Sequence, residues 1–254
     1  MGSAHSSQMM VGNRPLRGSR LFRRGVRFAY RLMIDGDYRS VLLTRLRRPA
    51  NLFQPYTDTA SDRYPLLFSF AREKLGANPG VRVLSIGCST GEEVFTLRRY
   101  LPTASITGLD INRRNIEICK ARLRRSPDTG IEFNVAGSTS GESAASCDAI
   151  FCLAVLRHGA LAASGAERCD RFIRFEDFEC MVADFARCLR IGGLLFIANS
   201  NFRFCDTAVY RSFEVALSLL SPVPDPRTPI YDRTNCLVRN AAYGDLVFRK
   251  LRDP

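Results

Sequence analysis

Short apolar runs alternate with amphipathic stretches along this chain, and the alternation predicts an α/β sheet. A strand buried on both faces is a continuous apolar run, whereas a helix repeats its apolar positions every three or four residues. Both patterns recur in the order strand, helix, strand. The expected strands are Val81–Ile86, Ser105–Ile111, Gly130–Ser138, Ala149–Val155 and Gly192–Ser200, and the expected helices are Glu92–Leu101, Arg113–Arg124 and Phe175–Leu189.

Further elements are expected on both sides of this pattern. Pro65 should open a helix over Leu66–Leu75, because proline is favoured in the first turn of a helix. A helix over Asp206–Leu220 and two short strands, Asn235–Arg239 and Asp245–Leu251, are expected near the end. The last strands would form the antiparallel edge of the sheet. The fold class is therefore α/β, a doubly wound, seven-stranded, Rossmann-like sheet with an N-terminal helical extension.

A turn of small residues, Gly87–Gly91, follows the first expected strand. Its glycines allow a sharp bend and a close approach of the backbone to a ligand. Glu92 and Glu93 begin the next helix, where their charge would repel a pyrophosphate. The spacing Gly-x-Ser-x-Gly also differs from the dinucleotide fingerprint Gly-x-Gly-x-x-Gly. A ligand with a cationic amine fits better, and the methionyl part of S-adenosylmethionine has one.

Asp110 lies near the end of the second expected strand, 23 residues after Gly87, close to the interval of about 20 residues that is typical of an acid that binds a ribose. The alternative is that Asp110 only caps the following helix. Leu153 would pack near the adenine or the methionine. The predicted cofactor-binding residues are Gly87, Cys88, Ser89, Thr90, Gly91, Glu92, Asp110, Ile111 and Leu153.

The stretch from Cys88 to Glu93 resembles the signature of the chemotaxis-receptor glutamate methyltransferases, within the class I S-adenosylmethionine-dependent methyltransferases. Residues 147–152 resemble the fourth strand of that family and residues 192–200 the fifth, so the resemblance covers residues 50–202. It implies methyl transfer from S-adenosylmethionine, S-adenosylhomocysteine as product, and no metal. The short connection from Asp110 to Gly130 leaves no room for the receptor-binding subdomain, which argues against a chemoreceptor substrate.

His158 follows the fourth expected strand, and chemistry in such sheets lies beyond the carboxyl ends of the strands. We predict it as the catalytic residue, which would take a proton from a hydroxyl acceptor. A carboxylate acceptor would need no base, and a helix-capping role is the alternative. The resembling family has an asparagine at position 154 and a tyrosine at position 158, so the resemblance supports the cofactor but does not fix the acceptor chemistry. The predicted substrate-binding residues are Tyr56, Arg63, Arg157 and Asn199.

Residues 14–48 hold eleven arginines against two aspartates, so this span supplies nine of the twelve net positive charges. Its apolar positions recur at helical intervals and predict two amphipathic helices with arginine-rich faces. The more specific interpretation is that this span is a docking surface for an acidic protein, a membrane or nucleic acid. No nucleic-acid recognition motif accompanies the charge. The expected organisation is a tag-like start at 1–13, a basic helical extension with a covering loop at 14–78, and a methyltransferase domain at 79–254.

The nine cysteines are scattered without a Cys-x-x-Cys pair, which favours reduced thiols in a cytoplasmic protein over disulfides or a metal site. No apolar run has the length of a membrane-spanning helix. The predicted function is O-methylation of a carboxylate or hydroxyl on a small molecule, natural product or peptide. Three alternatives stay open: an RNA or protein methyltransferase, a regulatory protein that binds the cofactor without turnover, and an α/β-hydrolase with Ser89 as nucleophile.

Overall fold

The computed structural model describes residues 26–30, 32–47, 52–54 and 60–254. The chain divides into two compact units, Met1–Ser40 and Val41–Pro254. Residues 26–30 and 32–34 of the first unit are helical, and helix α2 (Gly36–Arg47) begins there. Asp35 precedes α2, and its carboxylate accepts a hydrogen bond of 2.9 Å from the Tyr38 backbone N–H. The arginines before residue 26 lie outside the described residues.

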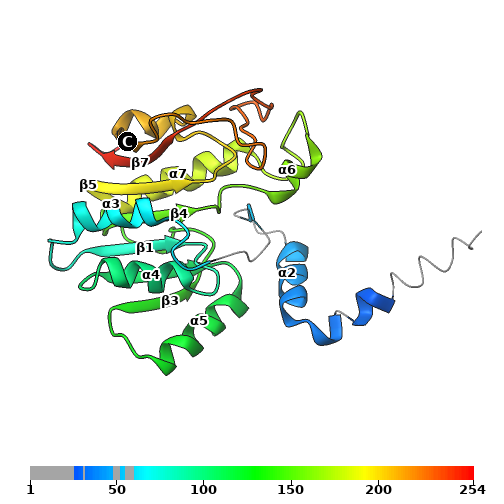
Figure 1. Ribbon diagram of the computed structural model, residues 1–254, viewed down its shortest axis with the longest axis horizontal. Helices are drawn as coiled ribbons and strands as arrows, with labels where there is room; N and C mark the ends of the chain where they lie inside the picture. Colours follow the sequence, from blue (N-terminus) through cyan, green and yellow to red (C-terminus); the bar gives the residue numbers. More distant parts are fainter. Residues whose placement is uncertain (1–25, 31, 48–51, 55–59) are drawn as a thin grey trace, which may run out of the picture. The chain divides into compact units, whose positions relative to one another are not determined.

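The described part of the second unit is built on a seven-stranded sheet with the strand order β3-β2-β1-β4-β5-β7-β6 (Figure 1). The first five strands are parallel, and β7 runs antiparallel to both β5 and β6. This is the doubly wound α/β sheet that the hydrophobic pattern predicts. The strands are β1 (Arg82–Ile86), β2 (Ser105–Asp110), β3 (Ile131–Val135), β4 (Cys147–Leu153), β5 (Leu189–Ala198), β6 (Phe213–Ser218) and β7 (Asp245–Lys250).

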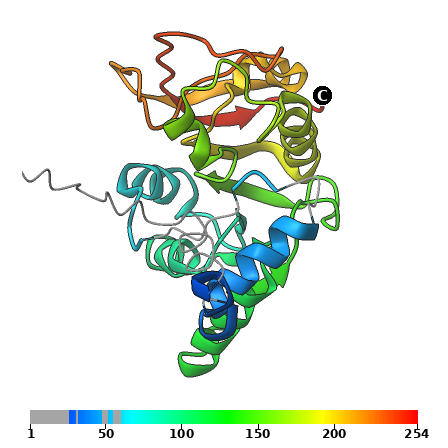
Figure 2. The same ribbon diagram turned by 90° about the vertical axis from the view of Figure 1, so that its right-hand side faces the viewer.

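Helices cover both faces of the sheet. Figure 2 shows α3 and α4 on one side of the strands and α7 on the other. Alternate residues of β1 serve the two faces, since Val83 belongs to the core under α3, α4 and α5, and Leu84 to the core under α7. None of the described helices is long and apolar enough to cross a membrane. The helices of this unit are α3 (Pro65–Leu75), α4 (Glu92–Tyr100), α5 (Arg113–Arg125), α6 (Gly159–Ser164) and α7 (Phe175–Cys188).

The prediction of a helix over Asp206–Leu220 is wrong. Two short 3-10 turns, Phe204–Asp206 and Ala208–Ser212, lead directly into β6. Strand β6 pairs with β7, and Glu214 forms an ion pair of 2.7 Å with Arg249 across the pair. Tertiary pairing with a strand distant in sequence thus overrides the local helical pattern.

The prediction of a strand over Asn235–Arg239 is also wrong, because this segment forms only isolated β-bridges. Asn235 has a positive φ of 64° and is buried, and its side-chain oxygen accepts a hydrogen bond of 2.7 Å from the Phe175 backbone N–H. The segment therefore caps the start of α7. The antiparallel edge of the sheet is made by β6 and β7 instead.

Candidate functional site

The turn after β1 bends through three residues with positive φ, Gly87 (66°), Ser89 (51°) and Gly91 (92°). A Cβ atom on Gly87 would lie 2.5 Å from Cγ2 of Val155, a distance that real Cβ contacts essentially never show. Gly87 is therefore required both by its backbone angle and by its neighbour beyond the end of β4. The turn lies at the carboxyl end of the parallel strands, the edge at which such sheets bind ligands.

Asp110 ties this turn to the end of β2. Its buried carboxylate accepts hydrogen bonds from the Ser89 N–H (2.8 Å), the Asn112 N–H (2.7 Å) and the Asn115 side-chain amide (3.2 Å). Burial raises the pKa of Asp110, and the two backbone donors oppose the rise. A carboxylate has about four acceptor positions, so one remains for a ribose hydroxyl. The cap of α5 is Asn112, whose side chain accepts from the Arg114 N–H.

Ser89 presents a polar atom to this turn without a protein partner. Its Oγ is buried and has no hydrogen-bond partner among the described residues. A buried hydroxyl without a partner costs about 1–3 kcal/mol, so a polar ligand group at the turn would relieve it. This orphaned hydroxyl, together with the two glycines, fits the polar tail of an amino acid.

The two acids at the start of α4 have different surroundings. Glu92, which the sequence analysis assigns to the cofactor, forms an ion pair of 2.5 Å with Arg122 and accepts a hydrogen bond of 2.7 Å from Ser61. The Arg122 hydrogen bond lowers the pKa of Glu92. Glu92 thus connects α4 to Arg122 of α5 and to Ser61, and each of its two carboxylate oxygens has one of these partners.

Glu93 is the acid that turns toward the strand. It accepts a hydrogen bond of 2.7 Å from the buried Ser85 hydroxyl of β1, beneath the turn. Desolvation raises the pKa of Glu93 to about 7, while the Ser85 hydrogen bond and the charge of Arg63 act against the rise. An ammonium group in the turn would stabilise the ionised form of this carboxylate. Glu93 is a candidate site residue that the sequence analysis did not assign.

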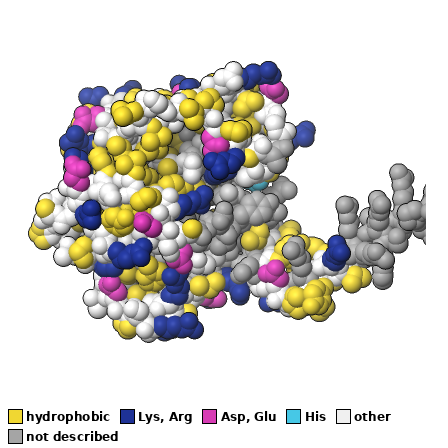
Figure 3. Space-filling view, viewed as in Figure 1, with side chains coloured by type: hydrophobic (Ala, Val, Ile, Leu, Met, Phe, Trp, Pro, Cys, Tyr) yellow, Lys and Arg dark blue, Asp and Glu magenta, His cyan; other side chains and the backbone are white. Residues whose placement is uncertain are grey.

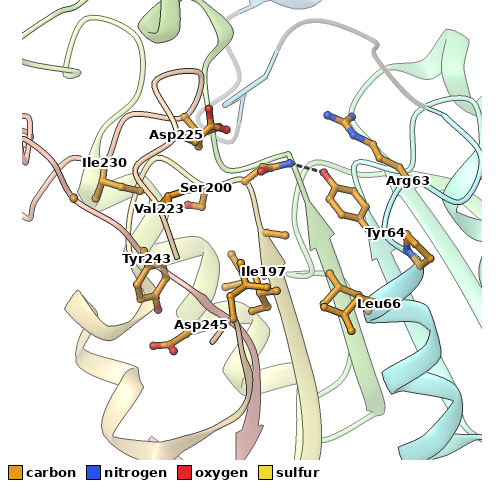
Figure 4. A pocket seen from close by; sticks show the side chains of 18 residues that line it. Arg63, Tyr64, Leu66, Ile197, Ser200, Val223, Asp225, Ile230, Tyr243 and Asp245 are labelled. Carbon is orange, nitrogen blue, oxygen red and sulfur yellow. Dashed lines mark hydrogen bonds between the residues drawn. The ribbon is translucent and has the colours of Figure 1, made fainter. Parts of the chain in front are cut away.

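A cavity of about 400 Å³ lies beyond the carboxyl end of β5 (Figure 4). The start of α3 forms one wall, with Arg63, Tyr64 and Leu66, and the segment that leads into β7 forms the other. In Figure 3, hydrophobic side chains gather on the face of the molecule over α3 and the last strands. The remaining lining residues are mostly apolar: Pro65, Leu67, Ile197, Ala198, Asn199, Ser200, Leu219, Val223, Asp225, Thr228, Ile230, Ala241, Tyr243, Asp245 and Leu246.

Tyr64 and Asn199 meet at the α3 end of this cavity. The Asn199 side-chain amide donates a hydrogen bond of 2.8 Å to the Tyr64 hydroxyl oxygen (Figure 4). Burial raises the pKa of Tyr64, so its hydroxyl keeps its proton. The charge of Glu93 acts in the same direction as burial, and the charge of Arg63 acts against it. Of the predicted substrate-binding residues, Arg63 and Asn199 line the cavity.

The predicted substrate-binding residue Arg157 lies outside the cavity lining. Its guanidinium donates a hydrogen bond of 2.8 Å to the carbonyl of Arg227, in the opposite wall segment. Tyr56 lies outside the described residues. Among the predicted cofactor residues, Leu153 is buried at the end of β4 and packs in the core beneath α3 and α4.

His158 is the N-cap of α6. Its Nδ1 accepts a hydrogen bond of 3.2 Å from the Ala160 N–H, and its ring lies 5.1 Å from that of Phe172. An imidazole that accepts through Nδ1 carries its proton on Nε2 in the neutral form, so Nε2 can donate but cannot accept. This geometry matches the capping alternative, and the base role stays a prediction.

A family model described as "Methyltransferase domain" matches residues 77–222. The matched stretch includes the turn, strands β1 to β5 and Asn199, which follows β5. The chain belongs to the methyltransferase domain family. The seven-stranded sheet with its antiparallel β7 is the fold expected of that family. Within the described residues, no group of three metal-ligating side chains could hold an ion.

Two curated relatives of this methyltransferase domain are similar over shorter stretches. A ubiquinone biosynthesis O-methyltransferase of Leptothrix cholodnii is 24% identical over 112 residues, 43% of this chain and 47% of that protein. A demethylmenaquinone methyltransferase of Lactococcus lactis subsp. lactis is 32% identical over 62 residues, 24% of this chain and 25% of that protein. The matched stretches thus span less than half the length of these relatives.

Among solved structures, the phosphoethanolamine N-methyltransferase 2 of Haemonchus contortus superposes with a TM-score of 0.42 at 14% identity. That superposition covers 65% of this chain and 32% of the other. The family assignment is general, so the finer resemblance to the chemotaxis-receptor enzymes stays a prediction. The hydrolase alternative loses support, because Ser89 Oγ has no hydrogen-bonded histidine in the described part of the chain.

Proposed function

We propose that this methyltransferase moves the methyl group of S-adenosylmethionine to an oxygen atom of a small molecule. The observation that carries the proposal is that two sites lie at the carboxyl edge of the same parallel strands. One is the turn with the Ser89 hydroxyl and the Glu93 carboxylate, and the other is the cavity beside Tyr64.

The chain's own residues would bind and orient the two reactants. S-adenosylmethionine supplies an activated methyl group on its sulfonium. Glu93 would pair with the ammonium group of its amino-acid tail, Ser89 would hydrogen-bond that tail, and Asp110 would offer its remaining acceptor position to the ribose. Gly87 and Gly91 let the backbone make this tight turn, since an added Cβ atom would meet Val155 at the first position and Phe95 and Cys119 at the second.

The acceptor would bind in the cavity at the end of β5. The lining is mostly apolar, and about 400 Å³ is enough for a molecule the size of a substituted aromatic ring or a medium-length chain. The names of both curated relatives refer to quinones, which are apolar molecules, and one of the two is named an O-methyltransferase. These similarities support a small apolar acceptor over RNA or protein.

Calorimetry with S-adenosylhomocysteine tests the cofactor half of the proposal. We expect binding in the wild type and a loss of at least about tenfold in affinity for Glu93→Gln, since a charge-assisted hydrogen bond is removed. Glu92→Gln is the matched control, because its carboxylate is engaged by Arg122 and Ser61. Absence of heat and of a thermal shift in the wild type would refute the proposed function.

Turnover assays test the second half of the proposed function, which concerns the methyl acceptor. Incubation with S-adenosylmethionine and a series of apolar acids and alcohols should yield a product heavier by one methylene unit. Bulkier side chains at the cavity, for example Ile197→Phe or Ala198→Leu, should lower turnover while leaving affinity for S-adenosylhomocysteine unchanged. Equal loss of both would mean that the cavity is not a separate acceptor site.

A further inference from the structure

Four large aliphatic side chains are exposed at the opening of the cavity beyond β5. Leu219 and Val223 line the cavity on the side of the last strands, and they are 43% and 77% exposed. Leu66 of α3 lines the opposite side and is 52% exposed (Figure 4). Leu220, next to Leu219, is fully exposed. Single leucines are common on protein surfaces, but a group of them at one opening indicates a binding surface.

The segment Leu219–Val223, which we call the leucine loop, is fixed to the start of β7. The Leu219 backbone N–H donates a hydrogen bond of 2.9 Å to the carbonyl of Gly244. A Cβ atom on Gly244 would lie 3.1 Å from Cβ and Cγ of Pro222, so the missing side chain lets the loop pack closely there. The loop is thus held on both sides of Leu220, which belongs to neither hydrophobic core. The fold therefore presents Leu220 to the outside.

The composition of the leucine loop favours a lipid partner over a protein partner. Its residues are two leucines, a serine, a proline and a valine, with no charge and no aromatic ring. Protein interfaces draw most of their binding energy from tryptophan, tyrosine and arginine, whereas leucine and valine are under-represented among their hot spots. Apolar side chains are what a protein buries at the boundary between lipid headgroups and acyl chains. The next acid along the chain, Asp225, forms an ion pair of 3.1 Å with Arg227, which offsets its charge.

The place of the loop in the sheet links this surface to the cavity. Strands β5 and β6 run in the same direction, because each pairs antiparallel with β7. The loop that follows β6 therefore lies at the carboxyl edge of the sheet, where the cavity opens. Apolar molecules partition from water into lipid. With this opening at a lipid surface, an apolar acceptor would pass between Leu66 and Val223 without crossing water.

We propose that the leucine loop and Leu66 dock this protein on the surface of a lipid bilayer, with the opening of the cavity toward the lipid. Leu220 and Val223 enter the boundary between headgroups and acyl chains. The contact is made by burial of apolar surface, so it forms on uncharged bilayers as well as on anionic ones. This inference goes beyond the proposed function, because docking on a bilayer requires neither S-adenosylmethionine nor an acceptor.

Sedimentation of the full chain with phosphatidylcholine vesicles tests the proposal. We expect the wild type to bind these uncharged vesicles and Leu220→Asp to bind at least about tenfold more weakly, because a charge replaces a buried leucine. Ile191→Asp is the matched control. Ile191 is 63% exposed and lies near the start of β5, at the opposite edge of the sheet, so this variant should bind as the wild type does. Since both replaced side chains are exposed, both variants should keep the melting temperature of the wild type.

Fluorescence locates the contact on the protein. The chain has no tryptophan, so Leu220→Trp carries a single reporter at the tip of the leucine loop. We expect its emission to move to shorter wavelength when phosphatidylcholine vesicles are added, and to be quenched by vesicles of brominated phosphatidylcholine. Ile191→Trp, at the opposite edge of the sheet, should show neither change.

Three results would overturn the docking proposal. The first is that the wild type does not sediment with uncharged vesicles. The second is binding to anionic vesicles alone, equal in wild type and Leu220→Asp, which would assign the contact to the arginine-rich span of residues 14–48. The third is a wild-type dimer in light scattering that Leu220→Asp converts to a monomer, since a second copy would then cover the loop. Calorimetry with S-adenosylhomocysteine tests the methyltransferase function independently of all three.

Discussion

The Ser85 hydroxyl of β1 donates a hydrogen bond of 2.7 Å to the Glu93 carboxylate of α4, across the turn that joins them. This contact directs Glu93 beneath the turn, whereas its neighbour Glu92 reaches outward to Arg122. Desolvation of this position raises the pKa of Glu93 to about 7, far above that of an ordinary glutamate. The ligand-free protein therefore carries an acid that is half protonated near neutral pH.

Ligand-free stability should fall as the pH rises through neutrality. A carboxyl whose pKa is higher in the folded than in the unfolded chain stabilises the folded state in its protonated form. The contribution of Glu93 is complete below about pH 4.5 and is lost as the pH rises through about 7. Thermal unfolding between pH 5 and 8 should show this decline in wild type and not in Glu93→Gln. A parallel decline in both proteins would assign the effect to other groups.

Affinity for S-adenosylhomocysteine should change with pH in the opposite sense. The ammonium group of the ligand pairs with the ionised form of Glu93, so binding must displace a proton below about pH 7. We expect affinity to rise between pH 5.5 and 7, by at most about tenfold per pH unit. Glu93→Gln should flatten the profile and Glu92→Gln should preserve it. A flat wild-type profile would show that Glu93 does not meet the ammonium group.

Gly87→Ala should destabilise the protein because two constraints coincide there. The residue has a φ of 66°, and its added Cβ would lie 2.5 Å from Cγ2 of Val155. We expect a loss of about 1–3 kcal/mol in the free energy of unfolding, measured by urea denaturation. Val155→Ala in the same chain removes the clash but not the backbone strain, so it should restore only part of the loss. Complete restoration would mean that the φ angle costs nothing.

His158→Asn separates capping from catalysis. Asparagine is a good N-cap but cannot act as a base, whereas His158→Ala loses both properties. Because Nδ1 of His158 accepts the Ala160 N–H, we expect Asn to retain stability and turnover, and Ala to lose about 1 kcal/mol of stability. A collapse of turnover in His158→Asn, with stability intact, would establish the base role predicted from the sequence.

The parallel strands and the turn could be predicted because their signals are local. Val83, Leu84 and Ile86 are buried as a continuous apolar run requires, and Gly87 has the positive φ that only glycine adopts easily. Strand β6 could not be predicted, because its partner β7 lies about 30 residues further along the chain.

The candidate site likewise contains features that local sequence signals predict and features that depend on contacts between distant residues. Glu92 and Glu93 are adjacent and chemically identical, and only the contacts with Arg122 and Ser85 tell which one turns inward. A helical period of 3.6 offers the missed signal, since Glu93 is followed on one face of α4 by the buried Thr96 and Leu97. The pairing of Tyr64 with Asn199 joins residues 135 positions apart, and no local pattern indicates it.

Asp110→Asn should loosen the turn at one identifiable bond. One carboxylate oxygen accepts from both Asn112 and Asn115, and the other accepts only from the Ser89 N–H. An asparagine would keep its oxygen on the first side, where two donors converge, and place its own NH₂ group against the Ser89 N–H. We expect a loss of about 1–3 kcal/mol in unfolding free energy and at least about tenfold in affinity for S-adenosylhomocysteine. Hydrogen exchange should accelerate at the Ser89 amide and not at the Asn112 amide. Asn115→Ala, which removes a donor but spares the turn, is the control, and equal acceleration at both amides would show that Asp110 does not hold the turn through this bond.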